Sequence, residues 1–117
     1  MTKIDIREEK GRFILEADGH SGYSSRGSDI VCSAVSILCF TLLNTVIEKD
    51  DKKLCVTYKQ KDGYFYLSFL HHEDEGLKAV FYAVCNGLQM LSEQYEEYVS
   101  LRFFTNRGEI INKVMQQ

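Results

Sequence analysis

Two side chains in the first third of the sequence can together perform nucleophilic chemistry. His20 lies in a stretch with glycines at positions 19, 22 and 27, and Cys32 follows at the start of a long apolar segment. A thiol attacks a carbonyl only as the thiolate, and a cysteine with the ordinary pKa of about 8.5 is mostly protonated at neutral pH. The first turn of a helix stabilises an anion, and an imidazole within about 3 Å can accept the thiol proton. The pair therefore predicts a cysteine nucleophile with a histidine base.

The residues between and around this pair suggest supporting functions. Ser28 is a suitable N-cap for the helix that carries Cys32, and Asp29 complements the positive end of its dipole. The Asp29 carboxylate is also a candidate to orient the His20 imidazole, although its charge would oppose a thiolate. The glycines of the loop 19–27 are typical of a segment that closes over a substrate, and a merely tight turn is the alternative.

On residue types alone, a purely structural interpretation of the pair is the more common one. A lone cysteine on an apolar helix usually packs in the core, and a lone loop histidine is usually exposed. Cys39, Cys55 and Cys85 fit this interpretation, because each lies within an apolar segment. What favours a catalytic Cys32 is its position at a predicted helix start, directly after the glycine loop.

Composition favours a globular chain that needs no metal or cofactor. The 117 residues are enough for one core, so we expect a single domain over residues 1–117. A net charge of −3 leaves no basic face for nucleic acid. Four cysteines without Cys-x-x-Cys spacing and an N-terminus unlike a signal peptide predict free thiols and a cytoplasmic location. His71 and His72 are adjacent and would point apart, so we expect no zinc site.

Apolar periodicity predicts an α+β fold, a two-layer sandwich on a mostly antiparallel sheet. The expected elements are strands at 4–6 and 13–17, a helix over about 29–47, strands at 52–58 and 64–70 around an Asp-Gly turn, a helix from 74 to about 97, and a strand at 99–104. This order, β-β-α-β-β-α-β, contains hairpins rather than alternating strands and helices, which indicates that fold class. Gly87 inside the second helix predicts close helix packing. The tail 105–117 has no role that we can assign.

The segment 30–47 contains no charged residue and is long enough to raise the possibility of a membrane span. Serines, threonines and an asparagine interrupt it, and the strands on either side have no membrane role, so we interpret it as a buried helix and expect no membrane contact. A helix that is apolar all round is covered on more than one side. The second helix or a twin subunit would provide this cover, which makes a homodimer a reasonable hypothesis.

The stretches GHSGY at 19–23 and GSDIVCSAVS at 27–36 resemble the signature of the bacterial ribosomal-processing cysteine protease family. That family has a G-H-x-G-Y loop followed by D-I-V-C-x-A-V-S on a helix, and the spacing between two unusual motifs is a specific signal. The resemblance implies a cytosolic homodimer that removes an N-terminal extension from the twenty-seventh large-subunit ribosomal protein. It also implies that His20 is the general base and Cys32 the nucleophile, with supporting roles for Asp29 and Ser36.

The family's extension is rich in aromatic residues, so the resemblance implies an apolar groove beside the loop. Candidate substrate-binding residues are Gly19, Ser21, Gly22 and Tyr23, with Tyr23 as one wall of the groove. We expect the oxyanion of the reaction to lie against backbone N–H groups at the helix start, including that of Cys32. The competing hypothesis is a non-catalytic, dimeric ribosome-assembly or peptide-binding module in which Cys32 only packs. A thiol redox protein is a weaker third class, because no second cysteine lies at Cys-x-x-Cys spacing.

Overall fold

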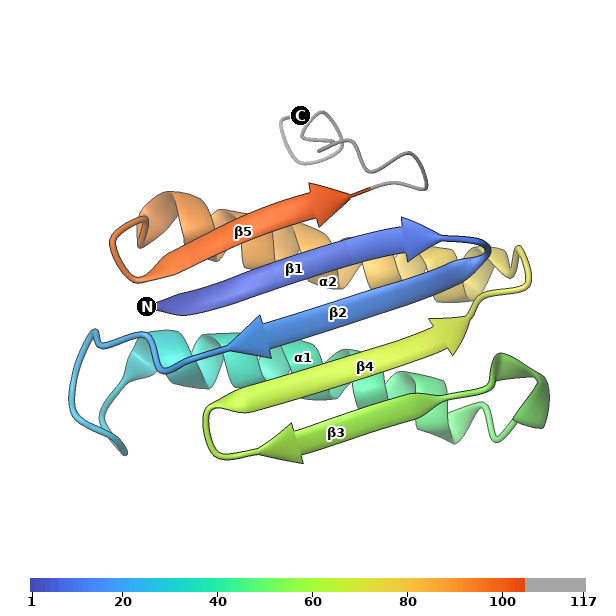
Figure 1. Ribbon diagram of the computed structural model, residues 1–117, viewed down its shortest axis with the longest axis horizontal. Helices are drawn as coiled ribbons and strands as arrows, with labels where there is room; N and C mark the ends of the chain where they lie inside the picture. Colours follow the sequence, from blue (N-terminus) through green and yellow to red (C-terminus); the bar gives the residue numbers. More distant parts are fainter. Residues whose placement is uncertain (105–117) are drawn as a thin grey trace.

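A five-stranded sheet with two helices packed on one of its faces forms the fold (Figure 1). The computed structural model describes residues 1–104 of the chain. In chain order the elements are β1 (Thr2–Glu9), β2 (Arg12–Asp18), α1 (Ile30–Glu48), the 3-10 helix η1 (Lys52–Leu54), β3 (Thr57–Lys61), β4 (Tyr64–Leu70), α2 (Glu75–Gln94) and β5 (Val99–Phe104). The predicted α+β class and the two layers are confirmed.

The sheet is mixed, with the strand order β3-β4-β2-β1-β5. The pairs β1–β2, β2–β4 and β3–β4 are antiparallel, as the hairpin pattern predicts. The pair β1–β5 is parallel, because the chain passes through α2 and returns beside the N-terminal strand. This order leaves β3 at one edge of the sheet, next to the helix α1 (Figure 1).

Alternation along the strands sends one apolar row from each central strand towards the helices. Ile4 and Ile6 of β1 are at most 1% exposed, as are Phe13 and Leu15 of β2. The Phe13 ring stacks on Phe81 of α2, with centroids 3.9 Å apart and planes within 4° of parallel. Burial of such side chains is the main force that holds the helices on the sheet.

The helix α1 is covered on one side and exposed on the other. Among the described residues it is the one helix whose length and hydropathy would suffice to cross a membrane, a property that it shares with many core helices. Its buried side chains are Val31, Val35, Cys39, Leu42, Leu43 and Val46. Ile30, Ile37 and Ile47 on its outer side are 45–65% exposed. The expected cover on a second side is therefore partial.

The two helices approach closely at Gly87, as its position in the sequence predicts. A Cβ added there would lie 3.0 Å from both Cδ atoms of Leu38 on α1. The missing side chain thus makes room for a leucine from the neighbouring helix.

The predicted strand at 52–58 is wrong in its first half. Lys52–Leu54 form a 3-10 turn, because the Asp51 carboxylate accepts a hydrogen bond from the Lys53 amide at 2.9 Å. Cys55 then adopts a left-handed φ of 48° and is exposed, contrary to the expected packing role. The strand β3 begins only at Thr57, and all five of its residues are exposed, so no buried row of residues marks it. The tail 105–117 lies outside the described residues.

Candidate active site

Three segments meet at the end of the sheet where β2 finishes and α1 begins. The connection 19–29 leaves β2, passes beside the turn between β3 and β4, and enters α1 (Figure 1). Its start is fixed, because the Gly19 amide donates to the Gly63 carbonyl at 2.8 Å and the Gly19 carbonyl accepts from the Thr2 hydroxyl at 2.9 Å. These contacts bring the histidine loop, the first turns of α1 and the β3–β4 turn around one cavity.

The cavity has a volume of about 400 Å³ and runs from Cys32 along α1. Its inner part is apolar: the cavity is lined there by Val35, Cys39, Phe40 and Phe65. The rings of Phe40 and Phe65 meet edge to face, with centroids 5.5 Å apart. Its rim carries polar residues of β3 and the turn, among them Gln60, Lys61 and Asp62. An apolar groove beside the loop is therefore present, and it extends between α1 and the edge of the sheet.

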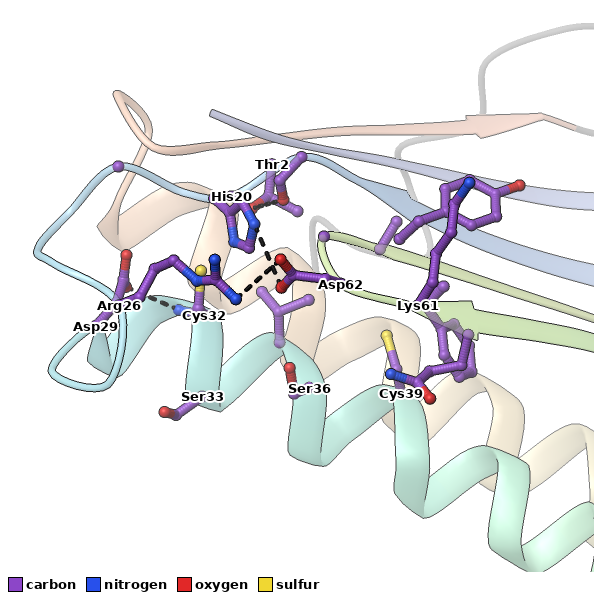
Figure 2. Close-up of a pocket in the computed structure, with 18 of the residues that line it drawn as sticks. Thr2, His20, Arg26, Asp29, Cys32, Ser33, Ser36, Cys39, Lys61 and Asp62 are labelled. Carbon is purple, nitrogen blue, oxygen red and sulfur yellow. Dashed lines mark hydrogen bonds and ion pairs between the residues drawn. The ribbon is translucent and has the colours of Figure 1, made fainter.

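Cys32 lies in the first turn of α1, at the edge of the cavity. The side chain is partly buried, and it lines the cavity together with His20 (Figure 2). The backbone N–H of Ser21 donates to its Sγ at 3.3 Å. A donor of this kind and the positive end of a helix both favour negative charge on the sulfur. Cys39 contrasts with it, because burial raises the pKa of its thiol to about 12.

Asp29 is the N-cap of α1, a position that the sequence suggested for Ser28. Its carboxylate accepts hydrogen bonds from the Cys32 amide at 2.9 Å, the Ser21 hydroxyl at 2.6 Å and the Ser24 amide at 3.4 Å. Burial opposes its ionisation, but these hydrogen bonds prevail and lower the pKa of Asp29 from 3.8 to about 2. Asp29 is thus an anion that ties the loop to the helix.

Two expectations about this part of the site are corrected. The partners of the Asp29 carboxylate are Ser21, Ser24 and Cys32, so it does not orient the imidazole in this structure. The Cys32 amide is engaged by Asp29, so it is not free to bind an oxyanion. The backbone N–H that points at the Cys32 sulfur is that of Ser21.

The carboxylate beside His20 comes from the β3–β4 turn. The ring Nε2 lies 3.6 Å from Oδ1 of Asp62, and Arg26 holds Oδ2 of the same carboxylate at 2.8 Å (Figure 2). Gly63, with a φ of 75°, lies against the ring, and a Cβ there would be 3.0 Å from Nε2. Sequence reasoning identified Asp62-Gly63 as a turn signal but not as part of the site. No local signal links it to His20, which lies 42 positions earlier.

The other candidate residues divide into two groups. Gly19, Gly22 and Ser36 line the cavity. Ser21 is 2% exposed and acts inside the loop, with its hydroxyl on Asp29 and its amide on the Cys32 sulfur. Tyr23 does not line the cavity. Its ring packs edge to face on Tyr95 and Tyr98, at centroid distances of 5.5 and 5.2 Å, and so it supports the loop from behind.

A thiol at a helix N-terminus, an imidazole on an adjacent loop and an open cleft are the groups that a cysteine-dependent hydrolase on an α+β scaffold requires. Comparison with known proteins agrees with this class. The family described as "Cysteine protease Prp" matches residues 1–100, and the chain belongs to this family. Its members are hydrolases that act on peptides.

The alignments with curated relatives extend over almost the whole length of those relatives. The chain is 24% identical over 105 residues to the ribosomal processing cysteine protease Prp of Staphylococcus aureus strain Mu50, which covers 88% of this chain and 99% of the relative. It is 27% identical over 112 residues to the protein of the same name from Bacillus subtilis strain 168, covering 91% and 98%.

Solved structures show the same fold. The S. aureus protease in complex with a covalently linked product peptide superposes with a TM-score of 0.76 at 23% identity, covering 88% of this chain and 99% of that one. The protein SMU.848 from Streptococcus mutans gives a TM-score of 0.66 at 28% identity, covering 90% and 95%.

Proposed function

We propose that this chain is a cysteine endopeptidase with a Cys32–His20 dyad. Its substrate would be the twenty-seventh large-subunit ribosomal protein, from which it removes the N-terminal extension during bacterial ribosome maturation. The observation that carries the proposal is the Ser21 N–H held at 3.3 Å from the Cys32 sulfur, in a cleft that His20 also lines. The names of the curated relatives support a ribosomal substrate.

The proposed reaction passes through an acyl-enzyme. His20 accepts the thiol proton as the Cys32 sulfur bonds to the scissile carbonyl carbon, and the carbonyl π electrons move to the oxygen. Collapse of this intermediate breaks the C–N bond, and His20 gives its proton to the leaving amine. His20 then takes a proton from water, and the resulting hydroxide attacks the thioester. Loss of the sulfur, which regains its proton from His20, releases the acid product.

The Ser21 N–H is our candidate donor to the oxyanion. It already points at the sulfur, so it lies beside the carbon that the sulfur would attack. The Cys32 N–H is occupied by Asp29, which leaves Ser21 as the nearer donor. In this proposal Asp29 holds the Ser21 hydroxyl and the start of α1 in one rigid unit. Ser36, exposed on the cavity side of α1, would contact the bound peptide.

We extend the proposal to a cytoplasmic homodimer. Exposed isoleucines at positions 30, 37 and 47 leave the outer side of α1 without cover in a single chain, and a second copy would bury them. The cysteines of the described residues are all free thiols, which is compatible with a reducing compartment.

A peptide-cleavage assay tests the proposal. The substrate is a synthetic peptide that spans the extension and the first residues of the mature ribosomal protein, and mass spectrometry identifies the products. We expect the wild type to cut at one bond, and Cys32→Ala and His20→Ala to reduce the rate at least a hundredfold. Cys55→Ala, which removes an exposed thiol outside the cavity, is the matched control and should retain activity.

Equal cleavage by wild type and Cys32→Ala would contradict the protease proposal. Binding of the intact peptide without cleavage by either protein would instead support a non-catalytic peptide-binding module.

A further inference from the structure

We propose that Asp62 is a positioning residue for the His20 imidazole, and that Arg26 sets how strongly it acts. The inference rests on the proposed function, in which His20 is the base. The Asp62 carboxylate lies on the Nε2 side of the ring, 3.6 Å away. In that position it favours the tautomer with hydrogen on Nε2, which leaves Nδ1 to accept the proton from Cys32.

A backbone hydrogen bond fixes the position of this carboxylate relative to the histidine loop. The turn that carries Asp62 is joined to the base of the histidine loop by the hydrogen bond from Gly19 to Gly63, at 2.8 Å. The ring lies against Gly63, where even a Cβ would come within 3.0 Å of Nε2. The ring and the turn are therefore fitted to each other. Movement of the loop relative to α1 would also have to carry the turn or break this contact.

The separation of 3.6 Å is too long for a hydrogen bond, so the carboxylate acts on the ring through its charge. This effect is largest when the ring itself is charged. The imidazole is neutral before the reaction and becomes an imidazolium when it takes the thiol proton. A carboxylate attracts the imidazolium much more than the neutral ring, so it stabilises the state that forms as the sulfur attacks. Catalytic contacts of this kind commonly tighten when substrate binds.

Arg26, which lies in the same loop as His20, weakens the attraction between the Asp62 carboxylate and the imidazolium. Its guanidinium lies 2.8 Å from Oδ2 of Asp62 and offsets part of the negative charge that the ring experiences. Other charged or titratable groups around the cavity are the Cys32 and Cys39 thiols from α1, the Lys61 ammonium from β3 and the Tyr64 hydroxyl from β4. Asp29 is directed to Ser21 and the start of α1. Asp62 is therefore the carboxylate that faces the ring, and Arg26 is its direct counter-charge.

Titration of the His20 ring by NMR tests the inference without requiring activity. The ring Cε1–H resonance is followed with pH in the Cys32→Ala background, where no thiol proton complicates the curve. We expect Asp62→Asn to lower the titration midpoint by about half a pH unit, the size expected for one exposed charge at this range. Arg26→Gln should raise the midpoint by a similar amount. Glu48→Gln, a charge removal at the other end of α1, is the matched control and should leave it unchanged.

Opposite shifts from Asp62→Asn and Arg26→Gln would support the inference, since a merely structural role would not give opposite signs. A midpoint that does not move in Asp62→Asn, in a protein that remains folded by circular dichroism, would overturn it.

Kinetics with the cleavable peptide provide the second readout. We expect Asp62→Asn to reduce kcat about tenfold and to change KM less than twofold, because the carboxylate acts on the ring and not on the peptide. Asp62→Glu, which restores the charge, should recover part of kcat. An unchanged kcat in Asp62→Asn would overturn the inference. If even the wild type fails to cut the peptide, the proposed function fails, while the NMR titration still decides whether Asp62 acts on the ring.

Discussion

At the residue scale, the polar groups around Cys32 have separate tasks. The Ser21 amide faces the sulfur. The Asp29 carboxylate forms hydrogen bonds to the loop and to the start of α1. The motif residues could be found from the sequence because they lie within one short segment. Their contacts could not be predicted, because the three donors to Asp29 lie up to eight positions away in the sequence, and only the backbone path of the loop brings them to the carboxylate.

The lowered pKa of Asp29 predicts a pH-dependent contribution to stability. A carboxyl with a pKa of 3.8 unfolded and about 2 folded stabilises the fold above pH 3.8, and this contribution is lost as the pH falls through 2. We expect Asp29→Asn to lower the free energy of unfolding by about 2 kcal/mol at pH 7. Urea denaturation at pH 7 and pH 2.5 measures the difference, which should shrink at the lower pH. A difference of the same size at both values would contradict the charge-based explanation.

At the element scale, the sequence predicted the elements that pack and misjudged those that do not. The buried row in β4 was predicted correctly, because the apolar residues Phe65, Leu67 and Phe69 occupy alternate positions and all three are buried. The stretch before β3 alternates in the same way, but Asp51 caps a 3-10 turn there. Asp62 could not be recognised as a neighbour of His20, because that contact depends on the pairing of β4 with β2 and on the turn that follows β3.

The anchor of the histidine loop gives a prediction at this scale. Gly19 has a φ of 98°, and a Cβ there would lie 2.6 Å from the Met1 carbonyl oxygen. Gly11 has a φ of 75° but nothing within 4 Å of the added atom, so it is the matched control for backbone strain alone.

We expect Gly11→Ala to cost about 1 kcal/mol of unfolding free energy and Gly19→Ala clearly more, because the second change adds a backbone clash to the strain. Thermal or urea unfolding of the two variants measures the comparison. Equal losses would show that the loop moves to accept the side chain and that its anchor is soft.

At the scale of the whole molecule, the cleft occupies one end of the sandwich and the outer side of α1 remains open. The sequence predicted the two layers, since the spacing of apolar residues depends on which face is buried. It could not establish what covers the rest of α1, because a face that meets another subunit has the same composition as a face that meets the core.

The proposed homodimer predicts that a charge on this outer side separates the subunits. Ile37 is 65% exposed, so Ile37→Lys should leave the fold of the single chain intact. We expect the wild type to sediment as a dimer and Ile37→Lys to shift towards the monomer. Met90→Lys, a comparably exposed position on α2, serves as the control for added charge. A wild type that is monomeric at high micromolar concentration would contradict the dimer.

Alkylation of the thiols as a function of pH tests most directly whether the Cys32 thiol is activated as a nucleophile. Iodoacetamide is added to the folded protein at a series of pH values, and mass spectrometry follows each cysteine separately. The exposed Cys55 serves as the internal reference, and the buried Cys39 and Cys85 should react last. We expect Cys32 to be alkylated faster than Cys55 at neutral pH, and His20→Ala to slow the reaction at Cys32. Equal alkylation rates at the two cysteines at neutral pH would contradict an activated thiolate at this site.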